Sequence, residues 1–229
     1  MNGDIPVWIP ILMAASAVFS AGMLVWAAAA SGAGSRKVLA LALFSAAILA
    51  IHGAAAASGF YLTTASQVPR IAIAAPTTII VLLVFVFAAM PKGDSPLKLL
   101  TLLHTVRLPV EIVLWQLFLY GSVPKVMTFE SVNLDFLSGL TAPFAAWIGF
   151  AGGRVRRKFL IVWNFATLAL LANIVFHAVL SVPSPFQRYG LDQPNVAVLH
   201  FPYVWLPAFI VPAVLAAHVW CLRELFRKE

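Results

Sequence analysis

The stretch LKLLTLLHTVRLPVEIVLWQLFLYG, residues 97–121, decides the fold of this chain. At 1.5 Å per residue it is long enough to cross the roughly 30 Å hydrocarbon core of a bilayer as one helix. It carries His104, Arg107 and Glu111, whose spacings of three and four residues place them on one stripe of that helix. An arginine or a glutamate at bilayer depth costs roughly 2.5 to 3.5 kcal/mol on insertion scales. We therefore expect the stripe to face the interior of a helical bundle.

The composition extends this prediction to the whole chain. Of its 229 residues, 62% are hydrophobic and only 10% are charged, and the mean hydropathy is +0.96. A soluble domain has roughly 25% charged residues. We predict an all-α, polytopic membrane bundle of seven transmembrane helices, which forms a single domain over residues 1–229. The predicted helices lie near 6–30, 37–59, 70–90, 97–121, 134–152, 158–182 and 200–222.

Lysine and arginine residues are distributed unevenly between the two ends of the predicted spans. Three of them, Arg70, Lys125 and Arg188, lie on one side. The other side has 11, namely Arg36, Lys37, Lys92, Lys98, Arg154, Arg156, Arg157, Lys158, Arg223, Arg227 and Lys228. The positive-inside rule then predicts an outer N-terminus and a cytoplasmic C-terminus. The formal net charge of +7 is thus assigned to topology and to contact with anionic membrane lipid, not to nucleic acid.

The polar stripe of the fourth predicted helix has two interpretations. Arg107 and Glu111 can form an i,i+4 ion pair, which would serve only to fix helix packing. Alternatively, Arg107 holds a carboxylate or phosphate while Glu111 or His104 exchanges a proton. Ionisable residues inside a membrane favour the functional interpretation.

Other polar residues collect toward the outer side, where the two long connections also lie. We expect a pocket that faces the periplasm and is formed by the fourth to seventh helices. Its predicted wall is Arg107, Glu111, Asn173 and His177, and its predicted mouth is Glu130, Asp135, Gln193, Asn195 and His200. The alternative for Asp135 and Asn195 is local: Asp135 would cap the fifth helix and Asn195 a turn before the seventh.

Three functions remain open on these residues. The leading hypothesis is binding or transport of a small anionic or lipid-like molecule, although the lack of an internal repeat weakens the transport version. The second is an intramembrane enzyme acting on a lipid or isoprenoid, with Glu111, His104 or Asp135 as general acid or base. The third is a haem or metal protein that uses His52, His177 and His200, although no metal-binding spacing supports it.

Several classes of protein are excluded by missing residues. The seventh predicted helix has no lysine, so retinal cannot form a Schiff base there. Nucleotide-binding, nucleophile-elbow and HExxH motifs do not occur. The single cysteine, Cys221, excludes a disulfide framework.

Two segments carry a resemblance to a known group. TFESVNLDFLSGLTAP (128–143) and LDQPNVAVLHFPYVWLPAFIVP (191–212) resemble segments of a group of uncharacterised bacterial seven-helix inner-membrane proteins. The resemblance covers mainly the C-terminal half. It implies a location in the bacterial inner membrane and no particular activity. The ligand and the oligomeric state stay open.

Overall fold

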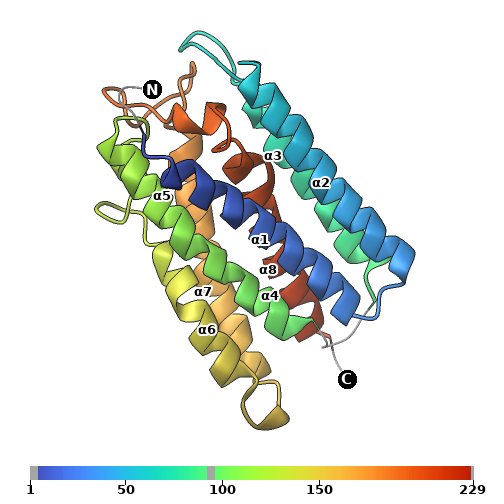
Figure 1. Cartoon of the computed structure of the whole chain (residues 1–229). Coiled ribbons are helices and arrows are strands. Elements are labelled where there is room, and N and C mark those ends of the chain that lie inside the picture. Colours follow the sequence, from blue (N-terminus) through green and yellow to red (C-terminus); the bar gives the residue numbers. More distant parts are fainter. Residues whose placement is uncertain (1–4, 92–95, 228–229) are drawn as a thin grey trace.

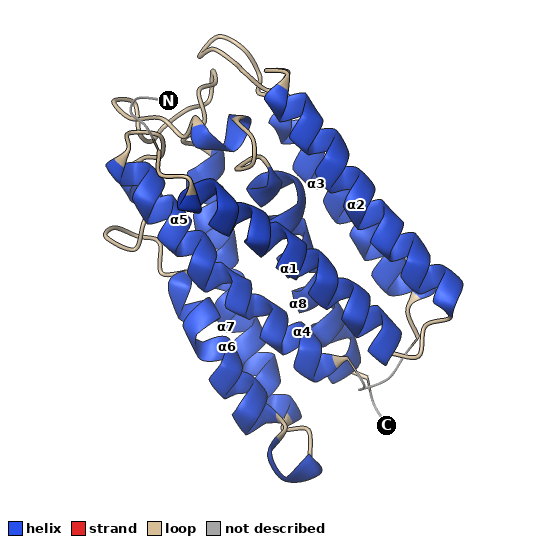
Figure 2. Cartoon of the chain, in the orientation of Figure 1, coloured by secondary structure: helices blue, strands red, loops and turns tan. Residues whose placement is uncertain are grey.

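The chain folds into one bundle of helices in a computed structural model that describes residues 5–91 and 96–227 (Figure 1). No strand occurs in these two ranges, as the colouring in Figure 2 makes plain. The α-helices are α1 (Trp8–Ala30), α2 (Ser35–Ala57), α3 (Ile71–Val84), α4 (Leu97–Leu103), α5 (Arg107–Leu119), α6 (Phe136–Gly149), α7 (Arg157–Val179) and α8 (Val211–Leu225). The shorter elements are η1 (Phe85–Ala89), η2 (His104–Val106), η3 (Lys125–Met127), η4 (Ala151–Gly153), η5 (Ala197–Leu199) and η6 (Leu206–Ile210).

Five helical stretches in the described part of the chain are long and apolar enough to cross a membrane. They are Trp8–Ala30, Ser35–Ala57, Ile71–Ala89, Arg157–Val179 and Leu206–Leu225. The prediction of an all-helical, membrane-type bundle is therefore confirmed. The fourth and fifth predicted spans differ from the expectation, because the fourth is interrupted and the fifth, α6, has only 14 residues.

The interruption in the fourth predicted span follows from Pro109. Proline lacks an N–H group and its ring clashes with the carbonyl four residues earlier, which here belongs to Thr105. The helix accommodates this by tightening into the 3-10 turn η2, between α4 and α5. Arg107 is the first residue of α5 and lies directly after this turn. The polar stripe therefore lies at a break in the helix. A 3-10 turn in the middle of a helix often marks a functional site.

The short length of α6 follows from the path of the preceding chain. After α5 the chain returns into the bundle before α6 begins, so that α6 packs on α4, η2 and the start of α5. Gly139 makes this approach possible, because a Cβ atom there would lie 2.5 Å from the backbone nitrogen of Leu108. The N-terminus of α6 thus reaches the middle of the 97–119 stretch instead of the end of the bundle.

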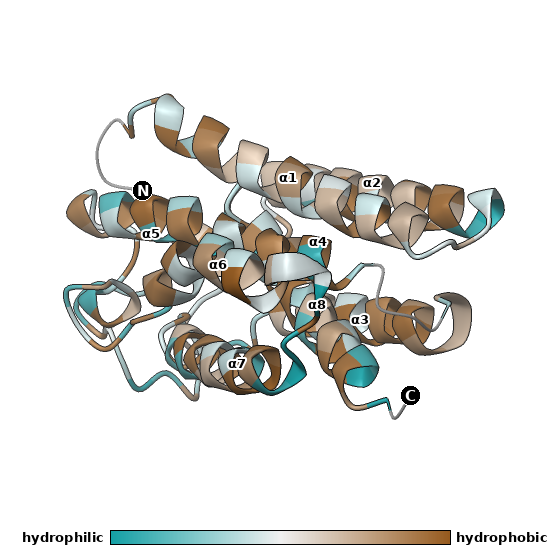
Figure 3. Cartoon of the chain, turned by 90° about the horizontal axis from the view of Figure 1, so that it is seen from below, coloured by the Kyte–Doolittle hydropathy of each residue, from teal (hydrophilic) through white to brown (hydrophobic). Residues whose placement is uncertain are grey.

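Helix α8 is the central element. About two thirds of the most apolar part of Leu206–Leu225, which consists of η6 and α8, is buried, against 17% for α2. It packs against α1, α3, α4 and α7, and Figure 3 shows it lying between α7 and α3. The outer helices instead present large apolar side chains to their surroundings, among them Leu39, Leu43 and Ile51 of α2. This is the distribution of a bundle that lies in an apolar solvent.

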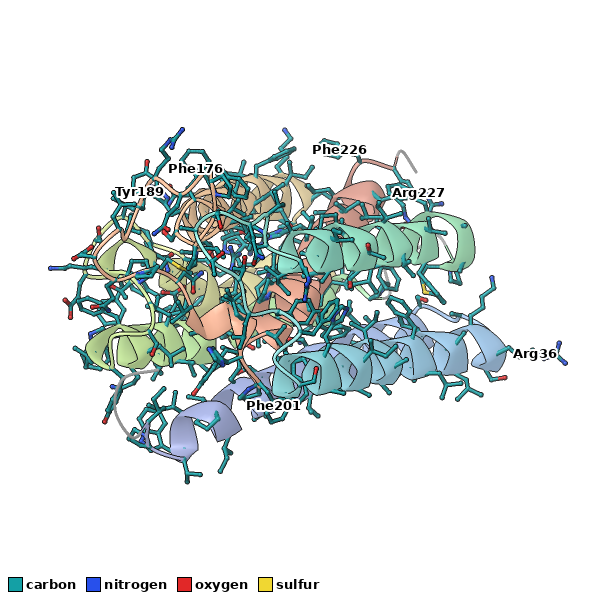
Figure 4. All side chains as sticks on the ribbon, turned by 90° about the horizontal axis from the view of Figure 1, so that it is seen from above. Arg36, Phe176, Tyr189, Phe201, Phe226 and Arg227 are labelled. Atoms are coloured by element: carbon teal, nitrogen blue, oxygen red, sulfur yellow. The ribbon has the colours of Figure 1, made fainter. Side chains whose placement is uncertain are left out.

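The two ends of the bundle differ in charge. Figure 4 shows Arg36 and Arg227 toward one end and Tyr189 toward the other. At the basic end, several cations bind carbonyls at the C-terminal ends of helices. The Nζ atom of Lys37 lies 2.8 Å from the Ala89 carbonyl oxygen, and Arg157 donates to the Glu224 carbonyl at 2.9 Å. Cations at helix C-termini complement the helix dipole.

Candidate functional site

Arg107 and Asp135 form the centre of the buried polar cluster. The Nε atom of Arg107 donates to Oδ2 of Asp135 at 2.7 Å, and its Nη2 atom donates to Oδ1. The side chains are 3% and 7% exposed, so the pair is shielded from solvent. A bidentate arginine–carboxylate pair of this kind fixes both position and orientation. The expected ion pair between Arg107 and Glu111 does not form, because Asp135 takes the guanidinium.

The remaining donors of Arg107 are also largely occupied. Its Nη2 atom donates to the Thr167 carbonyl oxygen at 2.9 Å, and its Nη1 atom lies 3.4 Å from Nε2 of His218. The other ring nitrogen of His218 lies 3.0 Å from Oδ1 of Asn164. Because arginine has only donors, Nε2 of His218 is the acceptor and its Nδ1–H donates to Asn164. Arg107 therefore joins α5, α6, α7 and α8.

His104 lies next to this cluster without joining its hydrogen bonds. Its ring centroid is 4.0 Å from that of His218, and the edge of Trp163 packs on it at 5.4 Å. The side chain is fully buried, and neither ring nitrogen has a hydrogen-bond partner. His104 thus faces the interior, as predicted, but it does not line the cavity described below.

Glu111 is bound by Asn133 instead of by a cation. Both carboxylate oxygens lie 2.7 Å from the Nδ2 atom of Asn133. The same nitrogen also donates to the Met127 carbonyl at 2.9 Å. The Oδ1 atom of Asn133 accepts the backbone N–H of Asp135 at 3.0 Å, which fixes the orientation of the amide. The segment before α6 therefore supplies a partner for Glu111 as well as for Arg107.

A cavity of about 130 Å³ adjoins these charged side chains. Arg107, Glu111 and Asp135 are the charged residues in its wall. The rest of the lining is apolar and includes Val110, Leu114, Met127, Leu171, Ile174, Val198 and Ile210.

The cavity reaches the surface between α3 and α7. The lining residues that are at least partly exposed come from this side, and they are Ala75, Val175, Ala178, Val179, Pro207 and Val211. The lining residues from α5 and from the segment before α6 are buried. The opening therefore lies on the apolar flank of the bundle, with the charged residues at the inner side.

Two predicted pocket residues on the outer side lie away from the cavity. Glu130 is exposed and accepts a hydrogen bond from Nε1 of Trp115 at 2.7 Å. Asn173 donates to the Val132 carbonyl at 2.9 Å and so ties the returning chain to α7.

Gln193 and Asn195 also serve the outer connections. The Nε2 atom of Gln193 donates to the carbonyls of Phe118 and Val123, at 2.8 and 2.6 Å. The backbone N–H of Asn195 donates to Ser181, while its buried side-chain amide has no hydrogen-bond partner. Asn195 therefore does not cap the turn as expected. Asp135 occupies the N-cap position of α6, but its side chain makes no capping bond because it binds Arg107.

The three outer histidines do not converge. The Nδ1 atom of His52 lies 2.5 Å from the hydroxyl oxygen of Tyr61, and that of His177 lies 2.9 Å from the Asn173 carbonyl. His200 is half-buried, and burial lowers the pKa of its imidazole. Within residues 5–91 and 96–227, no group of three or more His, Cys, Asp or Glu side chains is arranged to hold a metal ion.

Asn133, Asn164, Thr167 and His218 belong to the cluster but were not predicted as site residues. Asn133 had a local signal, since an asparagine two residues before an aspartate can accept its N–H in an Asx-turn. The other three carry no such signal. Thr167 and His218 contact Arg107 across 60 and 111 residues, and Asn164 contacts His218 across 54, so only the folded bundle brings them together.

The fold and the cluster define a class: a helical, membrane-type protein with a buried, ion-paired polar centre beside an apolar cavity. The chain belongs to the family described as "Domain of unknown function (DUF8737)", which matches residues 67–226. The match runs from just before α3 to the end of α8 and contains the whole polar cluster, whereas α1 and α2 lie outside it. No curated protein and no solved structure matches the sequence.

Proposed function

We propose that this protein is a seven-span membrane protein that binds a small, apolar or lipid-like molecule in the cavity beside Glu111, Asp135 and Arg107. In this proposal the broken stretch Leu97–Leu119 and the short helix α6 complete the five longer spans. The N-terminus is outside, the C-terminus is cytoplasmic, and the membrane is the inner membrane of a bacterium.

The observation that carries the proposal is the combination of an apolar cavity and a charged inner wall. Binding sites for small molecules have mainly apolar walls with a few polar groups that fix orientation. The opening between α3 and α7 would lie within the bilayer, so an apolar molecule could enter from the lipid without first crossing water. A volume of about 130 Å³ is close to that of a cavity that holds benzene.

Binding of an apolar molecule is favoured over anion transport because the guanidinium of Arg107 is already occupied. The anionic-ligand hypothesis needs a free guanidinium, whereas this one is bound by Asp135, Thr167 and His218. An anion would have to displace a bidentate carboxylate to reach it. We therefore retain the lipid-like part of the hypothesis and drop the anionic head group.

Ligand binding is tested by filling the cavity from its opening. Ala178→Phe adds a ring at the cavity wall, and Ala172→Phe adds the same ring to an exposed position of α7 outside the cavity. The wild type and both variants are purified in mild detergent and studied by native mass spectrometry. We expect a retained small molecule in the wild type and in Ala172→Phe but not in Ala178→Phe. An equal retained mass in all three proteins would place the ligand elsewhere.

The topology is tested by labelling single cysteines in a Cys221→Ser background. An impermeant thiol reagent added to spheroplasts should modify Asp192→Cys, and it should modify Arg36→Cys only after the membrane is opened. The reverse pattern would invert the bundle, and equal labelling of both positions from outside would contradict an odd number of spans between positions 36 and 192.

The enzyme hypothesis is kept as a second candidate because a carboxylate, Glu111, lies in the cavity wall beside a second carboxylate. Such a pair can act as general acid and base on a bound isoprenoid or lipid. Glu111→Gln would then retain the bound molecule but lose its conversion, whereas a binding protein converts nothing in either form.

A further inference from the structure

The geometry points to a positively charged ligand: we infer that Glu111 holds the ammonium group of a small hydrophobic amine whose apolar body fills the cavity. This inference rests on the proposed cavity-binding function and names the chemistry of its ligand. Three observations carry it, namely the charge balance, the supply of hydrogen-bond donors to Glu111, and the apolar lining of the cavity.

The first observation is that the positive charge of the site is already matched. Arg107 is the cation in the cavity wall, and its bidentate partner is Asp135. Glu111 is a second carboxylate in the same wall, and no lysine or arginine lies within ion-pair distance of it in the described part of the chain. A site with ionised Glu111 therefore has one negative charge in excess, which a monovalent cation would neutralise.

The second observation is that Glu111 has too few donors for a buried carboxylate. A carboxylate has about four lone-pair positions. Both oxygens here share the one Nδ2 atom of Asn133, and that nitrogen also supplies a hydrogen to the Met127 carbonyl. One amide hydrogen is thus divided between two oxygens. The remaining positions suit an N–H-rich ligand such as an ammonium group.

The third observation is that the cavity offers an apolar body little else to bind. Apart from the three charged residues, the lining is almost entirely aliphatic, with Leu114, Leu171 and Ile174 among the largest side chains. A ligand there gains from burying hydrocarbon and can make its one ionic contact at the charged wall. A primary amine on a single ring or a short alkyl chain fits both the volume of about 130 Å³ and the charge.

The test uses four probes of similar shape: toluene, benzyl alcohol, benzylamine and benzoate. Dissociation constants are measured by ligand-observed NMR on the full chain in phosphatidylcholine nanodiscs, with empty nanodiscs as the reference for partitioning. The variants are Glu111→Gln, which keeps the size of the side chain, and Ala178→Phe, which fills the cavity. We expect benzylamine to bind roughly tenfold or more tightly than toluene, because hydrogen bonds to charged groups are the stronger ones. Benzoate should bind weakest of the four.

The variants distinguish binding of the cation by Glu111 from binding in the cavity itself. In Glu111→Gln, toluene should bind as in the wild type while the advantage of benzylamine disappears, and unchanged toluene binding also reports an intact fold. Equal affinities for benzylamine and benzyl alcohol, or an amine preference that survives in Glu111→Gln, would overturn the cation assignment while leaving the cavity in place. Toluene binding that is absent, or indifferent to Ala178→Phe, would overturn the proposed function itself.

Discussion

Replacing Asp135 with asparagine removes one charge of the buried pair and preserves its size. Arg107 would remain charged at 3% exposure, with only neutral hydrogen-bond partners: the Thr167 carbonyl, His218 and the amide oxygen of the new asparagine. Removing one partner of a buried ion pair costs about 3 to 5 kcal/mol of folding free energy. We therefore expect Asp135→Asn to lower the free energy of unfolding by about 3 to 5 kcal/mol.

The assay is reversible unfolding in mixed micelles, with SDS as the denaturant and far-ultraviolet circular dichroism as the signal. The matched control is Glu130→Gln, because Glu130 is an exposed carboxylate 3.9 Å from Lys125, and an exposed pair contributes at most about 1 kcal/mol. The double variant Arg107→Met with Asp135→Leu removes both charges and should cost less than Asp135→Asn alone. If Asp135→Asn unfolds within about 1 kcal/mol of Glu130→Gln, the buried pair does not have the assigned role.

Three further predictions concern packing, pH and burial. Gly139→Ala should cost about 1 to 3 kcal/mol, because its Cβ would meet the Leu108 backbone, whereas Gly22→Ala, with open space around it, should be neutral or stabilising by up to about 1 kcal/mol; equal melting temperatures would contradict the close approach of α6. Burial lowers the pKa of His200 in the folded protein, so the unfolded chain takes up this proton first, and stability should fall as the pH drops below about 6.5, the ordinary value. His200→Gln should flatten that part of the stability profile, and an unchanged slope would exclude His200 as the source. Cys221 is 1% exposed, so N-ethylmaleimide should modify it only after unfolding. The modification is followed by mass spectrometry, and rapid modification of the folded protein would show that α8 is not central.

Hydropathy was sufficient to predict the helices that carry no strong local breaker. The apolar runs near 6–30 and 158–182 correspond closely to α1 (Trp8–Ala30) and α7 (Arg157–Val179). It was insufficient at 97–121 and 134–152. Average hydropathy contains no information on the tighter turn that Pro109 causes, or on how far the segment between α5 and α6 runs back into the bundle before α6 begins. Both features depend on local backbone chemistry and on packing against other helices.

The stripe of His104, Arg107 and Glu111 was predictable as a buried face, since its energetic cost in lipid depends only on residue type and depth. The partners of these residues were not. One of the two interpretations paired Arg107 with Glu111 because they are neighbours on one helix, whereas the folded chain pairs Arg107 with Asp135 and Glu111 with Asn133. These contacts span 28 and 22 residues, and helical periodicity contains no information on such distances.

Because the chain returns into the bundle before α6, residues of a connecting loop supply part of the buried site. These residues do not add to the cost of inserting a helix into the membrane. Asn133 and Asp135 lie on a loop whose neighbours Glu130 and Ser131 are exposed, yet they supply the partners of Glu111 and Arg107. A new polar residue in a spanning helix costs roughly 2.5 to 3.5 kcal/mol at insertion, while a change in a connecting loop meets no such barrier. Selection can therefore retune the charge at the middle of this bundle through mutations in a segment that is never itself inserted as a helix.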